Sequence, residues 1–204
     1  MTESAIRHLI FRFEGVVTQA SEELVLRELA GERRVVEARM RLAIRDLACE
    51  VRAGRVAWAE YCAKVAAMAG SREIGELFAD RVERLFCLTA GIEKLLPEVA
   101  GRLECWLYCE GTVEELTPRL LRLRLDRFFP ENRRLFSADG LRTDRPSELV
   151  PALLARTASH IDELLWIDDR SSVDAALIRA GVNAAAFVDS YRLRRNLVLR
   201  GLIR

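Results

Sequence analysis

Apolar residues follow two different patterns along this chain. Between roughly residues 21 and 90 they recur at helical spacing, with almost no alternation typical of strands. Three apolar stripes in this block, over 36–51, 58–68 and 74–86, predict three helices. Gly54 and Gly70 follow the first two stripes, where glycine commonly ends a helix. The block is therefore expected to be entirely helical.

Short, continuous apolar runs replace this pattern outside the helical block. The runs are IRHLIF, LECWLYC, ELLWID and NAAAF, and each of the middle two precedes a stretch with helical spacing. Such runs are typical of parallel strands that are buried on both faces and joined by helical crossovers. The pattern predicts a Rossmann-like α/β core with a parallel sheet, formed by residues 1–18 and 91–204, and an inserted α-helical cap over 19–90.

Composition and charge exclude several classes of partner. Half of the 204 residues are apolar, and 32 basic residues balance 31 acidic ones. Because no overall positive field exists, we expect neither nucleic acid nor an anionic membrane as a partner. The sequence MTESAIRHL lacks an apolar signal core, which favours a cytoplasmic protein. The five cysteines form no CxxC pair, and reduced, packed thiols are expected.

Candidate chemistry is expected where the predicted strands end, because ligands of open parallel sheets bind beyond the carboxyl ends of the strands. A helix that begins near Thr112 offers backbone donors to an anion. Two adjacent carboxylates after a buried strand usually face a cation, either a metal ion or a basic side chain. The four strand-end motifs are Arg12-Phe13-Glu14-Gly15, Tyr108-Cys109-Glu110-Gly111, Arg145-Pro146 and Asp168-Asp169.

These four motifs, in this order and with a helical insertion after the first, resemble the haloacid dehalogenase-like (HAD-like) hydrolase superfamily over nearly the whole chain. Its members typically carry DxDGT or DxDGV after the first strand, Ser or Thr after the second, Lys-Pro before a later helix, and an acidic pair. The stretch EVRAGRVAWAEYCAKV resembles a helix junction of the helical-cap subfamily. The stretch DSYRLRRNLVLRGL resembles the last helix of its phosphatase-like and epoxide-hydrolase-associated branch.

The sequence departs from the superfamily at most of the catalytic positions, so its motifs are degenerate. The resemblance places the nucleophilic aspartate at Arg12 and the general acid and base at Glu14. A guanidinium is permanently cationic and cannot act as a nucleophile. We therefore assign no catalytic residue. The degenerate positions are Arg12, Glu14, Cys109, Arg145, Asp168 and Asp169, and the former metal positions among them are Glu14, Asp168 and Asp169.

The charges at these positions suggest an internal substitute for the metal ion. The five charged positions other than Cys109 carry a total of −1, the same total as the four carboxylates, lysine and Mg²⁺ of an active member. We therefore hypothesise that Arg12 borders the former metal site and pairs with Asp168 or Asp169, since an unpaired buried carboxylate is costly. No cofactor is expected; Mg²⁺ is expected only if the chain is an active hydrolase.

Three functions remain open at this point. The sequence favours a non-catalytic pseudo-hydrolase that binds a small anion or a protein partner in the cleft between core and cap. The first alternative is a phosphatase-type HAD-like hydrolase in which Glu14, Asp168 or Asp169 activates water. The second is a structural protein that acts as a homo-oligomer, such as a homodimer. The candidate anion-binding residues are Arg12, Gly111, Thr112 and Arg145.

Overall fold

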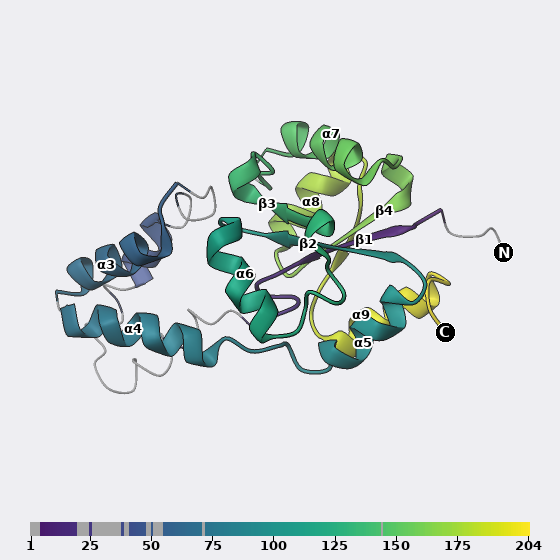
Figure 1. Ribbon diagram of the computed structural model, residues 1–204. Helices are drawn as coiled ribbons and strands as arrows, with labels where there is room; N and C mark the ends of the chain where they lie inside the picture. The colour runs from purple at the N-terminus through teal and green to yellow at the C-terminus, as the bar shows by residue number, and fades with distance from the viewer. Residues whose placement is uncertain are drawn as a thin grey trace.

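Five parallel strands form one sheet, in the order β3-β2-β1-β4-β5 (Figure 1). The structure is a computed structural model that describes residues 5–19, 25, 38, 41–47, 50, 55–70, 72–143 and 145–204. The predicted α/β architecture is confirmed, because all four predicted strands are present. The strands are β1 (His8–Arg12), β2 (Glu104–Cys109), β3 (Arg134–Phe136), β4 (Leu164–Asp168) and β5 (Asn183–Ala186).

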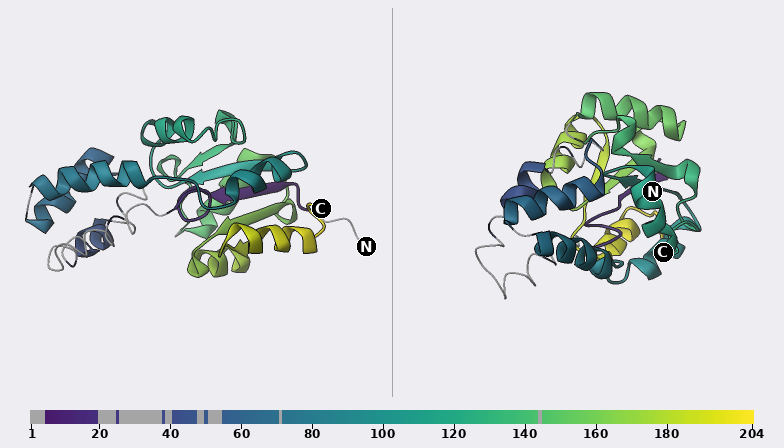
Figure 2. Two further views of the ribbon diagram at one scale, coloured as in Figure 1. Left: turned by 90° about the horizontal axis from the view of Figure 1, so that it is seen from below. Right: turned by 60° about the vertical axis from the view of Figure 1, so that its left-hand side comes forward.

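Helices cover both faces of this sheet. Helices α5 (Ile92–Ala100), α6 (Val113–Arg122) and α9 (Ser190–Leu199) share one apolar cluster with β1, β2 and β4. Helices α7 (Pro146–Thr157) and α8 (Ser171–Arg179) pack on the opposite face (Figures 1 and 2). Three single 3₁₀ turns lie at Glu131–Arg133, Ser137–Asp139 and Ile161–Glu163. Because every residue of β1 is buried, its apolar residues Leu9, Ile10 and Phe11 follow one another without alternation.

The chain between β1 and α5 contributes a pair of helices, α3 (Trp58–Ala69) and α4 (Arg72–Leu85), that lies beside the core sheet (Figure 1). Buried side chains from both helices form a separate apolar cluster. Gly70 ends α3 in the left-handed conformation, as its sequence position predicts. Met68 is 43% exposed, so it does not belong to the predicted buried stripe. Most of the helix predicted over 36–51 lies outside the described residues, although residues 41–47 are helical.

The structure bears on two further features, membrane-spanning helices and the state of the cysteines. None of the helices in the described part of the chain is long and apolar enough to cross a membrane. Four cysteines are described, and all four are free thiols; Cys49 lies outside the described residues. Cys62, Cys105 and Cys109 are buried, as expected, whereas Cys87 is exposed.

Candidate functional site

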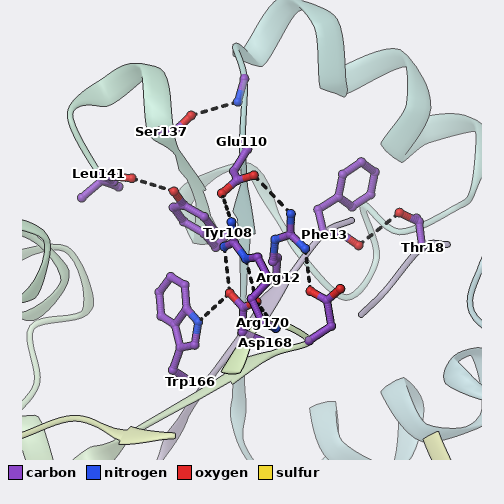
Figure 3. A network of polar contacts seen from close by, with 12 residues as sticks. Arg12, Phe13, Thr18, Tyr108, Glu110, Ser137, Leu141, Trp166, Asp168 and Arg170 are labelled. Atoms are coloured by element: carbon purple, nitrogen blue, oxygen red, sulfur yellow. Dashed lines mark hydrogen bonds and ion pairs between the residues drawn. The ribbon is translucent and has the colours of Figure 1, made fainter. Parts of the chain in front are cut away.

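Five charged residues meet at the carboxyl edge of the three central strands (Figure 3). Arg12 is the last residue of β1, and Asp168 is the last residue of β4. Glu110 follows β2 directly, whereas Asp169 and Arg170 connect β4 to α8. Because β1 lies between β2 and β4 with all strands parallel, these residues reach the same edge. We call this group the ion-pair network.

Arg12 bridges two carboxylates within the network. Its Nη1 donates to Oδ1 of Asp169 at 2.5 Å, and its Nη2 donates to Oε2 of Glu110 at 3.2 Å (Figure 3). The Arg12 side chain is only 9% exposed. Burial lowers the pKa of Arg12, but the charges of Glu110, Asp168 and Asp169 raise it more, so the pKa lies above its ordinary value. The hypothesised pairing of Arg12 with the acidic pair is confirmed for Asp169.

Arg170 is the second cation of the network. Its Nη1 donates to Oε1 of Glu110 at 2.6 Å. Its Nε and Nη2 donate to the two carboxylate oxygens of Asp168 at 3.0 and 2.9 Å, a bidentate arrangement. Glu110 therefore joins the two arginines. The network carries two positive and three negative formal charges, a total of −1, so it attracts cations more than anions.

Asp168 accepts four hydrogen bonds and is completely buried. The backbone N–H of Arg170 donates to Oδ1 at 2.9 Å, and Trp166 Nε1 donates to Oδ2 at 3.2 Å, in addition to the two side-chain bonds from Arg170. Burial raises the pKa of Asp168, but the hydrogen bonds and charge of Arg170 outweigh it and leave the pKa below its ordinary value. Because a carboxylate has about four lone-pair sites, Asp168 has no acceptor site left.

The structure separates the other sequence-predicted site residues from this network. Cys109 is completely buried in the core, and burial raises the pKa of its thiol well above the ordinary value, so it remains protonated. Arg145 precedes α7, and its Nη1 donates to Glu148 at 3.3 Å, with half of its side chain exposed. The backbone N–H of Gly111 donates to the Ser137 hydroxyl at 2.9 Å.

Glu14 and Thr112 follow the ends of β1 and β2 closely in sequence. Glu14 is half-buried and forms an isolated bridge with Thr18. Its charge contributes to the raised pKa of Cys109, second to burial. Thr112 directly precedes α6, and its carbonyl accepts from the backbone N–H of Leu116 at 3.3 Å. The anion-binding candidates thus have several different partners, and their described contacts do not show them converging on one point.

Solved structures of the same architecture identify the fold. A HAD family enzyme from Bacteroides thetaiotaomicron matches with a TM-score of 0.70 at 11% identity, covering 91% of this chain and 95% of its own. The L-2-haloacid dehalogenase from Xanthobacter autotrophicus, with chloropropionic acid covalently bound, matches with a TM-score of 0.63 at 16% identity, covering 97% and 86%. The chain has the haloacid dehalogenase-like fold. No protein-family model and no curated protein matches its sequence significantly.

The HAD-like fold raises the question of whether this edge fits a magnesium ion. The Bacteroides enzyme has also been solved in complex with magnesium and inorganic phosphate, at 11% identity and a TM-score of 0.68, covering 91% of this chain and 96% of its own. In the present chain the acceptor sites of Asp168 are filled by Arg170 and Trp166, and Arg12 is bonded to Asp169. Within the described residues, no three acidic, histidine or cysteine side chains are grouped to hold a metal ion. The residues as arranged therefore do not fit Mg²⁺.

Sequence analysis of this HAD-like chain found three members of the network and missed two. Arg12, Asp168 and Asp169 were selected, whereas Glu110 and Arg170 were not assigned a role. Both missed residues directly follow a buried strand or its acidic pair, so their position at a strand end was the available signal. The charge balance instead included Arg145, which the structure pairs with Glu148 of the helix that follows it.

Gly15 allows the loop of this HAD-like fold to approach Asp169 closely. Its φ is +88°, and an added β-carbon would meet the carboxylate of Asp169. We expect Gly15→Ala to lower the free energy of unfolding by about 2 kcal/mol, because it adds both backbone strain and a contact that moves Asp169 from Arg12. Urea unfolding measures this change.

Gly140 provides a matched control for Gly15. Its φ is +85°, but an added β-carbon would have nothing within 4 Å. Gly140→Ala therefore measures the backbone strain alone, about 1 kcal/mol. Equal losses for the two variants would show that Asp169 is not held by the close approach of Gly15.

Proposed function

We propose that this chain is a non-catalytic protein with a HAD-like fold, and that it acts by binding a protein partner without turnover. The observation that carries the proposal is Arg12, which stands at the position that the family resemblance gives to the nucleophile. Its guanidinium lies between Glu110 and Asp169 and cannot act as a nucleophile. The ion-pair network then has a structural role, as an internal replacement for a metal ion.

The choice of a protein partner over a small anion rests on the hydrogen-bond donors. Arg12 and Arg170 each bond to two carboxylates, and the N–H of Gly111 bonds to Ser137. An anion would have to displace these carboxylates from a network with a total charge of −1, which opposes its binding. A protein partner makes no such demand, because it binds a surface and leaves the network intact. A second copy of this chain is one possible partner, as a homodimer.

A hydrolase with a remodelled site is the second candidate. It is favoured by the similar folds of known enzymes and by Asp174, a buried carboxyl near Asp168 and Asp169. Burial, and then the charges of these two aspartates, raise the pKa of Asp174 to about 6. A carboxyl with a pKa in this range is suited to exchanging protons near neutral pH. This candidate requires a nucleophile other than Arg12, such as water.

Phosphatase assays test the proposal directly. The purified protein is expected to hydrolyse none of a broad panel of phosphate esters with Mg²⁺ present. The double variant Arg12→Asp, Glu14→Asp restores the two aspartates of the family motif and is assayed beside it. Activity of the double variant alone would support the loss of function at Arg12. Reproducible turnover by the wild type, retained after further purification, would overturn the proposal.

A magnesium titration followed by thermal unfolding provides an independent prediction. Because a ligand that binds only the native state raises the melting temperature, Mg²⁺ at about 10 mM is expected to shift the wild type by less than about 1 °C. The double variant removes the guanidinium of Arg12 and adds a carboxylate, so a shift of several degrees is expected there. A wild-type shift as large as that of the variant would contradict the role of Arg12 as an internal cation.

A further inference from the structure

Among the described residues, backbone hydrogen bonds join the two segments that connect α3 and α4 to the core, and we call this place the neck. The segments that enter and leave the insertion pair in antiparallel fashion through Thr18 and Leu88. The N–H of Gln19 donates to the carbonyl of Cys87 at 3.1 Å, and the N–H of Thr89 donates to the carbonyl of Val17 at 3.0 Å. Because the chain enters and leaves at this one place, a neck alone would let the helix pair pivot on the core.

A second attachment joins α4 to the core helix α6. Arg119 of α6 donates through Nε to Oε1 of Glu83 in α4 at 2.8 Å, and its Nη2 contacts the same oxygen. Only 8% of the Arg119 side chain is exposed. This contact joins two helices that are separated in sequence by β2 and α5, so it adds a side-chain attachment between insertion and core to the backbone pairing of the neck.

Aromatic rings complete the surroundings of Arg119. Its guanidinium carbon lies 4.8 Å from the ring centre of Trp58 in α3 and 5.0 Å from that of Phe86 after α4. Arg122, one turn further along α6, donates to the carbonyl of Phe86 at 3.3 Å. Phe86 also packs on Phe13, directly after β1, with ring centres 5.3 Å apart. Arg119 thus contacts both helices of the insertion with one side chain.

We propose that Arg119 is a latch that fixes the helix pair α3 and α4 against α6, so that core and insertion move as one body. Moving α4 away from α6 would leave the buried guanidinium without its carboxylate and without its two aromatic faces. This cost opposes the hinge motion that the neck by itself permits. The latch does not depend on whether the ion-pair network is catalytic, because none of its residues belongs to that network.

Distance measurements between spin labels test the latch in the full-length chain. Labels are placed at exposed sites on α3 and α8, through Met68→Cys and Ile178→Cys, with Cys49 and Cys87 replaced by serine. The otherwise unchanged protein is expected to give one narrow distance distribution. Arg119→Gln removes the charge and is expected to widen it about twofold or more. Arg119→Lys keeps the charge, and the width of its distance distribution is expected to lie between those of the unchanged protein and Arg119→Gln.

Arg84 supplies the matched control for this experiment. It is an exposed arginine of α4 that pairs with Asp80 on its own helix at 2.9 Å, so this ion pair does not join the insertion to the core. Arg84→Gln should leave the distance distribution unchanged. If Arg119→Gln does not fold, Glu83→Gln breaks the same contact at a side chain that is 38% exposed. A narrow distance distribution in the folded Arg119 or Glu83 variants would contradict the proposed role of Arg119. A broad distribution in the labelled protein that retains Arg119 and Glu83 would contradict it as well.

Discussion

Replacing Arg12 with methionine is expected to lower the free energy of unfolding by about 3–5 kcal/mol at pH 7. Methionine fills a similar volume but removes the cation that Glu110 and Asp169 share. Only 8% of the Glu110 side chain is exposed, so this carboxylate would stay buried with Arg170 as its remaining cation. The loss is large because Arg12 is one of the two cations that face three carboxylates in the network.

The effect of Arg12→Met should depend on pH in a defined direction. The pKa of Asp168 is raised by burial, but the hydrogen bonds and charge of Arg170, aided by Arg12, lower it below the ordinary value. Stabilisation from such a carboxylate is complete above about pH 4 and is lost as pH falls through the lower pKa of the folded protein. Protonated carboxyls need no cation. Urea unfolding at pH 7 and at about pH 3 is therefore expected to show a smaller difference between wild type and variant at the lower pH.

Two further variants test whether the loss of stability is specific to Arg12 or follows from the removal of any arginine. Arg7→Met removes a side chain that is 76% exposed and pairs with Glu163, and it should cost less than about 1 kcal/mol. Arg12→Lys retains the charge but not the fork that reaches two carboxylates, so an intermediate loss is expected. A loss below about 1 kcal/mol for Arg12→Met would mean that the network contributes little to folding.

The sequence predicted the central strands because burial on both faces imposes a simple pattern. Every residue of β1 and β4 is buried, and this burial produces the apolar runs LIF and LLWI, which hydropathy detects. The edge strand β3 was missed. It has three residues and begins with Arg134, a buried arginine whose Nε donates to the carbonyl of Phe129 at 2.9 Å. A short strand with a buried charge lacks the apolar run on which such a prediction depends.

The sequence predicted where the site lies, at the strand ends, but it did not predict all of the ion-pair partners. The strand-end rule correctly directed attention to Arg12 and Asp169, which the structure joins. The rule does not distinguish Arg145 from Arg170, because both follow strands in sequence and carry the same charge. The difference lies in side-chain direction: Arg170 turns back to Asp168, whereas Arg145 bonds to Glu148 of the following helix. Such directions depend on tertiary packing, which the spacing of residues does not encode.

Replacing Asp174 with asparagine is expected to stabilise the protein by about 2–3 kcal/mol at pH 8. Asp174 lies in the first turn of α8 and is 7% exposed, and neither of its carboxylate oxygens has a partner among the described residues. Burial is the main cause that raises its pKa to about 6, followed by the charges of Asp168 and Asp169. The folded protein therefore holds the charged form of Asp174 at a cost, which a neutral side chain of the same size avoids.

The pH dependence of the stability gain in Asp174→Asn shows whether the gain comes from removing a buried charge or from better packing. Below about pH 4, Asp174 is protonated in both the folded and the unfolded protein, so asparagine gains nothing there. The advantage of the variant should appear as pH rises and be complete above about pH 7. Asp126→Asn, at an exposed loop position, serves as the control and should show no such change. If Asp174→Asn raised the free energy of unfolding equally at pH 4 and pH 8, the gain could not come from removing an unpaired charge.

Arg12 and Asp174 together predict where the wild-type protein is most stable. The contribution of Asp168, whose low pKa depends on Arg170 and Arg12, is fully present above about pH 4 and is lost as pH falls through the lower pKa of the folded protein. The penalty at Asp174 has the opposite sign, because it grows as pH rises toward its pKa of about 6. This penalty begins near pH 4, where Asp174 ionises in the unfolded protein but stays protonated in the folded one. From these two groups, the free energy of unfolding should reach its maximum near pH 4, and Asp174→Asn should move that maximum toward neutral pH.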